Sequence, residues 1–183
     1  MTPYSLDFNL PDSAATEALG RALARSLPRE KVAGVDLATS ADLAGGAVVY
    51  LQGELGAGKT TCVRSLLRTL GVVGPVRSPT YTLVETYPLG TLTCVHVDLY
   101  RLQTLTEVDE LGLRDVLGPG CLLLVEWPEK GSQALPAADL DLRLRYAGEE
   151  RMASLQGLSV LGAAWMANLG LDTSLSSYVS NLT

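Results

Sequence analysis

Cysteine is scarce in this chain, and its few positions form no pattern. Cys62, Cys94 and Cys121 are odd in number, make no C-x-x-C pair and lie in apolar stretches. A secreted disulfide framework shows an even, regularly spaced set of cysteines instead. We therefore expect reduced thiols in the core and a cytoplasmic location.

The chain also lacks an excess of positive charge. Lys plus Arg number 14 against 20 Asp plus Glu, which gives a net charge of -6, and a surface of that sign repels a polyanion. Residues 1–9 show no export signal, and the apolar stretch near the end is interrupted at Gly162 and Asn168. We expect no membrane span, no DNA binding, and contact with RNA only through a partner protein.

Length and periodicity favour a single domain over residues 1–183. A helix is predicted from a cap at Asp12 or Ser13 to the residue before Pro28. Residues 28–46 show little periodicity and predict an irregular insertion, whereas the polar, serine-rich residues from about 170 to 183 predict a mobile tail.

Apolar runs of strand length predict a mixed sheet. Residues 47–51 and 121–125 are continuous apolar runs, typical of buried strands, and residues 60–70 repeat at helical spacing before Gly71. Residues 81–87 and 91–99 are joined by a link too short for a parallel crossover. They therefore predict a hairpin.

The last third of the chain predicts helices around one more hairpin. Thr106 stands in capping-box spacing before Asp109, which predicts a helix that ends near Gly112. Residues 140–146 alternate and turn toward residues 152–158, which predicts an antiparallel hairpin at the sheet edge, and residues 160–169 predict a terminal helix. The fold class is α/β with a mixed, mostly parallel sheet.

The loop between the first buried strand and the next helix matches the Walker A pattern. Its glycines let backbone N–H groups close around phosphates, its lysine reaches the β and γ oxygens, and the hydroxyl that follows falls on Mg²⁺. The flanking strand and helix are the context that a P-loop requires, so a merely tight glycine turn explains the motif less well. The sequence predicts ATP and Mg²⁺ as cofactors, held by Gly53, Glu54, Leu55, Gly56, Ala57, Gly58, Lys59, Thr60 and Thr61.

Two strands end in a carboxylate, at Asp98 and at Glu126. Ligands in open α/β sheets gather beyond the carboxyl ends of the strands, so either acid can serve the magnesium ion or a water molecule. The alternative is a capping or solvated acid. The sequence does not divide the two roles.

Further candidates flank these strands. Pro79 favours an extended Ser78 and so a Ser78–Thr80 loop over a γ-phosphate, although a plain connection into a strand fits as well. Trp127 after Glu126 is a rim group or simple packing. His96, the single histidine, lies in an apolar strand and is interpreted as a core imidazole.

Four motifs in this order, GELGAGKTT, SPTYTLVETY, HVDLYRL and LVEWPEK, resemble the TsaE (YjeE) family of ATPases, which are needed to make threonylcarbamoyladenosine in tRNA. The resemblance covers roughly residues 10–169. It implies a three-layer sandwich of the P-loop NTPase type. It also implies two partner proteins, TsaD, which carries the tRNA, and TsaB.

The resemblance implies roles for individual residues. Thr60 and Glu126 correspond to the magnesium ligands, Asp98 and Thr80 to switch or catalytic positions beside Lys59, and Trp127 to the family's functional tryptophan. Ser13 and Arg151 correspond to further nucleotide contacts.

The resulting hypothesis is a weak, partner-dependent ATPase. ATP and Mg²⁺ at residues 53–61 would hold the Ser78–Thr80 loop in a state that docks on TsaD–TsaB, and hydrolysis would reset that pair. One alternative is a small-molecule kinase, which should bring several lid arginines, yet only Arg101 and Arg114 occur between Arg77 and Lys130. The other is a nucleotide-gated adaptor without turnover.

Overall fold

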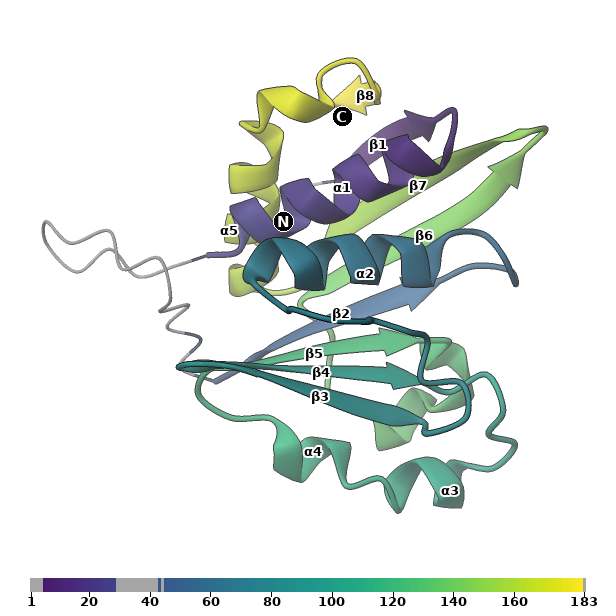
Figure 1. The fold of residues 1–183 in the computed structure, drawn as a ribbon, viewed down its shortest axis with the longest axis vertical. Helices are drawn as coiled ribbons and strands as arrows, with labels where there is room; N and C mark the ends of the chain where they lie inside the picture. The colour runs from purple at the N-terminus through teal and green to yellow at the C-terminus, as the bar shows by residue number, and fades with distance from the viewer. Residues whose placement is uncertain (1–4, 29–42, 44, 183) are drawn as a thin grey trace, which may run out of the picture.

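One eight-stranded sheet organises the protein. The structure, a computed structural model, describes residues 5–28, 43 and 45–182. The strand order is β3-β4-β5-β2-β6-β7-β1-β8, with the four central strands β4, β5, β2 and β6 parallel and the outer pairs antiparallel (Figure 1). This confirms the α/β class with a mixed sheet. The strands are β1 Ser5–Leu10, β2 Ala47–Gln52, β3 Val84–Leu89, β4 Leu92–Asp98, β5 Cys121–Glu126, β6 Leu140–Ala147, β7 Glu150–Gly157 and β8 Val179–Leu182.

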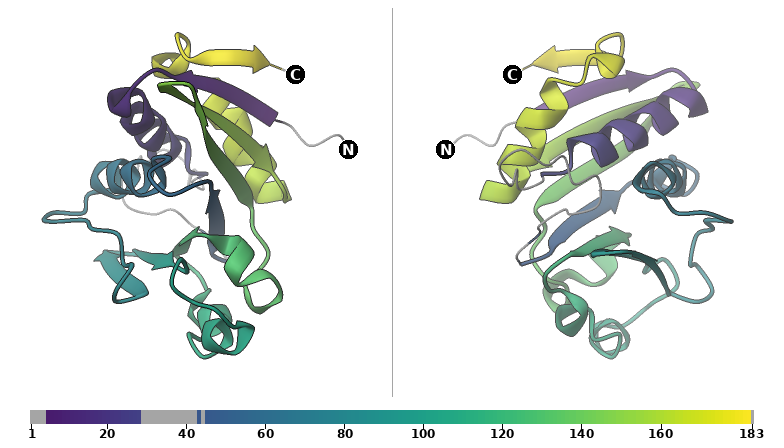
Figure 2. Two further views of the ribbon diagram at one scale, coloured as in Figure 1. Left: turned by 90° about the vertical axis from the view of Figure 1, so that its right-hand side faces the viewer. Right: turned by 60° about the vertical axis from the view of Figure 1, so that its left-hand side comes forward.

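Helices cover both faces of the sheet, but unequally (Figure 2). The larger core cluster joins α1, α2 and α5 to strands along the whole sheet. The smaller one joins α3, α4 and η2 to β2, β4 and β5. The helices are α1 Ser13–Ser26, α2 Lys59–Leu70, α3 Leu105–Asp109, α4 Leu113–Val116 and α5 Val160–Gly170, with short 3-10 turns η1 Pro128–Lys130, η2 Ser132–Ala134 and η3 Thr173–Leu175.

Alternation along β4 and β5 directs two carboxylates to the same place. Val95 and Val97 belong to the smaller cluster, whereas Cys94, two residues before His96, belongs to the larger cluster beneath α2. Because side chains alternate along a strand, His96 and Asp98 share the α2 face with Cys94. In the parallel register Asp98 lies beside Glu126, so the two acids end neighbouring strands on that face.

The helix boundaries largely follow the predicted signals. Asp12 caps α1, since its carboxylate accepts a 2.7 Å hydrogen bond from the Ala15 backbone nitrogen. Gly71 ends α2 in the left-handed conformation. The predicted cap at Thr106 is wrong: Thr104 caps α3, because the longer Glu107 side chain reaches back to the Thr104 nitrogen at 2.9 Å.

Both predicted hairpins form. The first has shifted boundaries, and the second lies in the interior of the sheet instead of at its edge. The first begins at Val84 because a turn closed by the 2.6 Å bond from Leu83 N to Pro79 O occupies the preceding residues. Its link is Gly90–Thr91, since Leu89 already pairs with Leu92. The β6–β7 hairpin is not at the sheet edge, because β1 and β8 lie beyond β7, and β3 forms the opposite edge.

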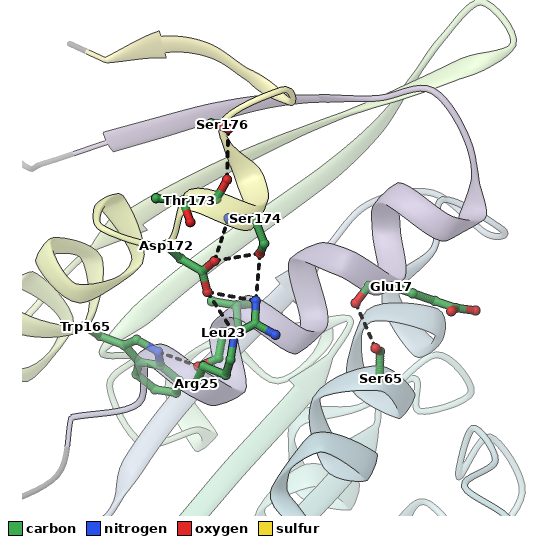
Figure 3. Close-up of polar contacts among 9 residues, drawn as sticks. All are labelled: Glu17, Leu23, Arg25, Ser65, Trp165, Asp172, Thr173, Ser174 and Ser176. Carbon is green, nitrogen blue, oxygen red and sulfur yellow. Dashed lines mark hydrogen bonds and ion pairs between the residues drawn. The ribbon is translucent and has the colours of Figure 1, made fainter.

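The C-terminal segment has a defined place where the sequence predicts a mobile tail. β8 pairs antiparallel with β1, which otherwise would be an open edge with unpaired backbone groups. Arg25 of α1 donates to Asp172 at 2.8 and 3.0 Å, and the Trp165 indole donates to the Leu23 carbonyl at 3.0 Å (Figure 3). The predicted insertion 28–46 lies mostly outside the described residues.

No helix within the described ranges is both long and apolar enough to cross a membrane.

Candidate functional site

A cleft of about 270 Å³ opens at the carboxyl ends of β2, β4 and β5. It brings together the predicted loop, both predicted acids, Thr80 and Trp127. The residues that line it are Leu55, Gly56, Gly58, Lys59, Thr60, Thr61, Ser78, Thr80, Asp98, Tyr100, Glu126 and Trp127.

The glycine loop has a backbone that other residues adopt only with strain. Gly53, Gly56 and Gly58 have φ values of 134, 80 and 109°. A Cβ on Gly53 would lie 2.1 Å from the Leu144 carbonyl oxygen of β6, so the loop is seated directly against a neighbouring strand. Ala57 is fully buried, whereas Glu54 and Leu55 are exposed at the tip.

Lys59, the first residue of α2, is held inside the loop. Its ammonium donates to the Gly53 and Glu54 carbonyls at 2.6 and 2.9 Å and lies 3.9 Å from the centroid of the Trp127 ring. Burial lowers the pKa of Lys59, and the negative charges of Glu126 and Asp98 oppose that effect. An ammonium has three donors, so a phosphate oxygen can take one without displacing both carbonyls.

Thr60 and Glu126 face each other in the cleft. The Thr60 hydroxyl is 2.9 and 3.0 Å from the two carboxylate oxygens of Glu126, a residue only 2% exposed. In the part of the chain that the structure describes, no cluster of three or more His, Cys, Asp or Glu side chains could cage a metal. A hydroxyl and a carboxylate nevertheless fit Mg²⁺, which takes few protein ligands and completes its shell with phosphate and water oxygens.

Asp98 gathers the hydroxyls of the Ser78–Thr80 loop. Its Oδ2 accepts hydrogen bonds from Ser78 at 2.5 Å and Thr80 at 2.7 Å, and Tyr100 N donates to Oδ1 at 3.0 Å. Asp98 is therefore more than a solvated strand end, and the loop both lines the cleft and leads into β3. Ser78 makes the same contact as Thr80, although the family resemblance implies a role for Thr80 alone.

Trp127 is both a rim group and a packing group. It is partly exposed, it lines the cleft, and its ring centroid lies 5.0 Å from that of Tyr100. Its φ of 60° is unusual for a bulky residue and turns the chain sharply after β5. That turn places the indole over Lys59.

The two candidates outside the main motifs lie differently. Ser13 is exposed at the start of α1 and is not among the residues that line the cleft. Arg151 of β7 does approach the loop, because a Cβ on Gly58 would lie 3.7 Å from its Cδ and 3.1 Å from Cγ2 of Thr16. Thr16 went unpredicted; its only signal was its place one helical turn after Ser13.

His96 is fully buried, as expected for a core imidazole. Its Nε2 also lies 2.9 Å from Oε1 of Glu126, which the sequence did not predict. The histidine therefore contacts Glu126, which lines the cleft, from the buried side.

Comparison with known proteins places these residues in a family. The family model described as "Threonylcarbamoyl adenosine biosynthesis protein TsaE" matches residues 10–153. A relative named tRNA threonylcarbamoyladenosine biosynthesis protein TsaE from Haemophilus influenzae is 44% identical over 115 residues, covering 63% of this chain and 73% of the relative. The protein of the same name from Bacillus subtilis is 33% identical over 126 residues, covering 69% and 78%.

A solved structure agrees on the fold. The crystal structure of Bacillus subtilis YdiB superposes with a TM-score of 0.69 at 24% identity, covering 93% of this chain and 97% of that one. The family model spans well over half of the sequence and includes all four motifs, β6 and the first half of β7. The chain belongs to the TsaE family.

Proposed function

We propose that this protein is an ATP-binding component of the threonylcarbamoyladenosine modification of tRNA. The family and the names of its relatives supply the pathway. The observation that carries the proposal is the convergence of Lys59, the Thr60–Glu126 pair and the Asp98–Thr80 contact in one cleft. The proposal treats residues 1–183 as one domain, since the strands in the described part of the chain share one sheet. It also includes a cytoplasmic location, in line with the reduced thiols expected from the sequence.

The nucleotide would be held by the loop and Lys59. Backbone N–H groups from Gly53 to Thr61 would surround the phosphates at the start of α2, where the helix dipole favours negative charge. Thr60 and Glu126 would hold Mg²⁺, which neutralises charge on the phosphates when bound. Arg151 and Thr16 approach the same loop from β7 and α1.

Asp98 would link the nucleotide to the Ser78–Thr80 loop. Its carboxylate holds both hydroxyls, so a phosphate that competes for them would change the position of the loop. Tyr81, which follows the Ser78–Thr80 loop, is 83% exposed. Leu55, at the tip of the glycine loop, is 69% exposed. These side chains supply an apolar contact for TsaD–TsaB, which ATP would favour and hydrolysis would release.

The two arginines that a kinase lid could use have other partners. The Arg101 guanidinium lies 3.9 Å from the Tyr81 ring centroid, and Arg114 donates to backbone carbonyls of residues 133–135. Both have structural partners, whereas a kinase lid needs arginines that close over the transferred group. The adaptor alternative uses the same cleft and differs only in lacking hydrolysis.

The deciding experiment is multiple-turnover threonylcarbamoylation of tRNA. TsaD, TsaB and the carbamoyl-adenylate synthase are assayed with ATP and either wild type, Lys59→Ala or the exposed control Lys130→Ala. We expect wild type and Lys130→Ala to support repeated turnover and Lys59→Ala to lower it at least about tenfold, because Lys59 meets the β/γ charge. Equal turnover with a folded Lys59→Ala would refute the proposal.

Two further measurements separate the alternatives. Phosphate release without any phosphorylated metabolite distinguishes an ATPase from a kinase. Support of repeated turnover by Glu126→Gln, with no phosphate release, would favour the adaptor.

A further inference from the structure

We propose that His96 is a positioning residue that holds the Glu126 carboxylate toward Thr60. Its magnesium consequence rests on the proposed function, whereas its hydrogen bond to Glu126 does not. Nothing in the four motifs assigns this histidine a role, and its burial by itself suggests only core packing.

The sheet register makes the contact possible. β4 and β5 are parallel neighbours in which His96 lies beside Leu124 and Asp98 beside Glu126. His96 and Glu126 are therefore on the same face, one diagonal step apart. Their Nε2 and Oε1 atoms are 2.9 Å apart, and the side chains are 0% and 3% exposed.

Glu126 needs a second donor, and His96 supplies it. The Thr60 hydroxyl lies within 3.0 Å of both carboxylate oxygens, but a hydroxyl has one hydrogen and can donate to only one oxygen at a time. A buried carboxylate with a single donor is poorly satisfied. The imidazole donates to Oε1 and so leaves Oε2 for Thr60 and for a ligand in the cleft.

The contact also determines the tautomer. With the hydrogen on Nδ1, two acceptors would face each other at 2.9 Å, and the Nδ1–H would be buried without a partner. The tautomer with the hydrogen on Nε2 removes the contact between two acceptors and leaves Nδ1 as an unpartnered acceptor. Hydrogen positions of this kind follow from the network of partners.

Core packing alone explains His96 poorly. Its Nδ1 is buried without a hydrogen-bond partner among the described residues. An aliphatic side chain would fill the space in β4 without leaving a polar atom unsatisfied. The hydrogen bond from Nε2 to Glu126 offsets that penalty, whereas packing alone does not.

The first test is nuclear magnetic resonance of the imidazole, without nucleotide or Mg²⁺. His96 is the single histidine of the chain, so every imidazole signal belongs to it. We expect the Nε2–H tautomer with a slowly exchanging proton, and a shift of the ¹⁵Nε2 and Hε2 signals in Glu126→Gln. The Nδ1–H tautomer, or signals unchanged by Glu126→Gln, would overturn the proposal.

The second test is calorimetric binding of ADP with and without Mg²⁺. We expect His96→Leu to lose about 10- to 100-fold of the Mg²⁺-dependent gain in affinity, as other groups that orient metal ligands do. His96→Gln keeps an N–H donor and should retain the gain to within about threefold. Val95→Ala, a neighbouring core change on the opposite face of β4, should retain it fully.

The outcomes separate the two levels of the argument. Unchanged Mg²⁺ dependence in a folded His96→Leu, equal losses in the Leu and Gln variants, or an equal loss in Val95→Ala would each overturn the positioning role. If wild type gains nothing from Mg²⁺, the magnesium part of the proposed function is wrong, and the imidazole spectrum decides the role of His96.

Discussion

At the scale of single residues, Lys59 is a charged side chain whose burial opposes the stability of the fold. It is 4% exposed, and burial lowers its pKa from the ordinary value of 10.5. A base whose pKa is lower in the folded state binds its proton more weakly there than in the unfolded chain. Its charge therefore destabilises the fold at neutral pH, and stability rises as the pH rises from the folded pKa toward 10.5.

Lys59→Met should therefore stabilise the nucleotide-free protein. We expect a gain of about 0.5–2 kcal/mol at pH 7, the size often found when a strained functional site is relieved. The same variant should lose nucleotide binding. Thermal unfolding and calorimetry measure the two effects, and a lower melting temperature for Lys59→Met would contradict the prediction.

The thiols should be inert while the protein is folded. Burial raises the pKa of Cys62 and of Cys94 to about 12 and raises that of Cys121 as well. At pH 8 the thiolate of a group with such a pKa is about one molecule in ten thousand, and the thiolate is the reactive form. A disulfide reagent should modify none of the cysteines in the native protein and all three in urea; rapid native labelling would show an accessible thiol.

At the scale of elements, the conformation of the glycine loop depends on the strand beside it. Gly53 lies against the Leu144 carbonyl of β6, whereas the nearest atom to a Cβ on Gly56 is the Tyr146 hydroxyl at 2.7 Å. A backbone carbonyl within a sheet cannot move aside, but the end of an exposed tyrosine can. The two glycines therefore differ in what they tolerate, although both have positive φ.

Gly53→Ala should accordingly cost more than Gly56→Ala. We expect about 3 kcal/mol or more for Gly53→Ala, from the strained backbone and the clash together. Gly56→Ala should cost about 1–2 kcal/mol from the backbone alone. Urea unfolding at constant m value measures both, and equal losses would show that the β6 contact does not constrain the loop.

At the scale of the whole molecule, the two ends of the chain stabilise each other. β8 extends the sheet beyond β1, and the Arg25–Asp172 ion pair joins α1 to the segment before η3. Burial raises the pKa of Asp172, but hydrogen bonds from Ser174 and Arg25 outweigh it, so the net pKa lies below 3.8. This contribution to stability is present above pH 3.8 and is lost as the pH falls through the folded value.

Arg25→Gln tests this contact between the chain ends. We expect a loss of about 0.5–1 kcal/mol at pH 7, as for other partly exposed ion pairs, with nucleotide affinity unchanged. The difference from wild type should shrink as the pH falls below 3.8. Arg68→Gln, an exposed arginine of α2, serves as the control; a pH-independent difference would mean that Asp172 is not the partner that matters.

The sequence by itself determined the features that depend only on residues close together in the chain. The glycine loop between an apolar strand and an amphipathic helix is a local signal, because its backbone geometry and its lysine are encoded within a few positions. Asp98 and Glu126 were also predictable, since each directly follows an apolar run. The Asp12 cap and the Gly71 stop are local for the same reason.

The tertiary structure alone decided which segments meet. β1 carries a local strand pattern, because Leu6, Phe8 and Leu10 alternate with Asp7 and Asn9, but its partners β7 and β8 are set only by packing. The four-residue β8 becomes a strand by pairing with β1. Thr16 lies near Gly58 only because α1 packs beside the start of α2. His96 contacts Glu126 only because β4 and β5 pair in this register. Contacts of that kind join residues far apart in the chain, and no local pattern encodes them, because the side-chain partner is supplied by the packing of the sheet.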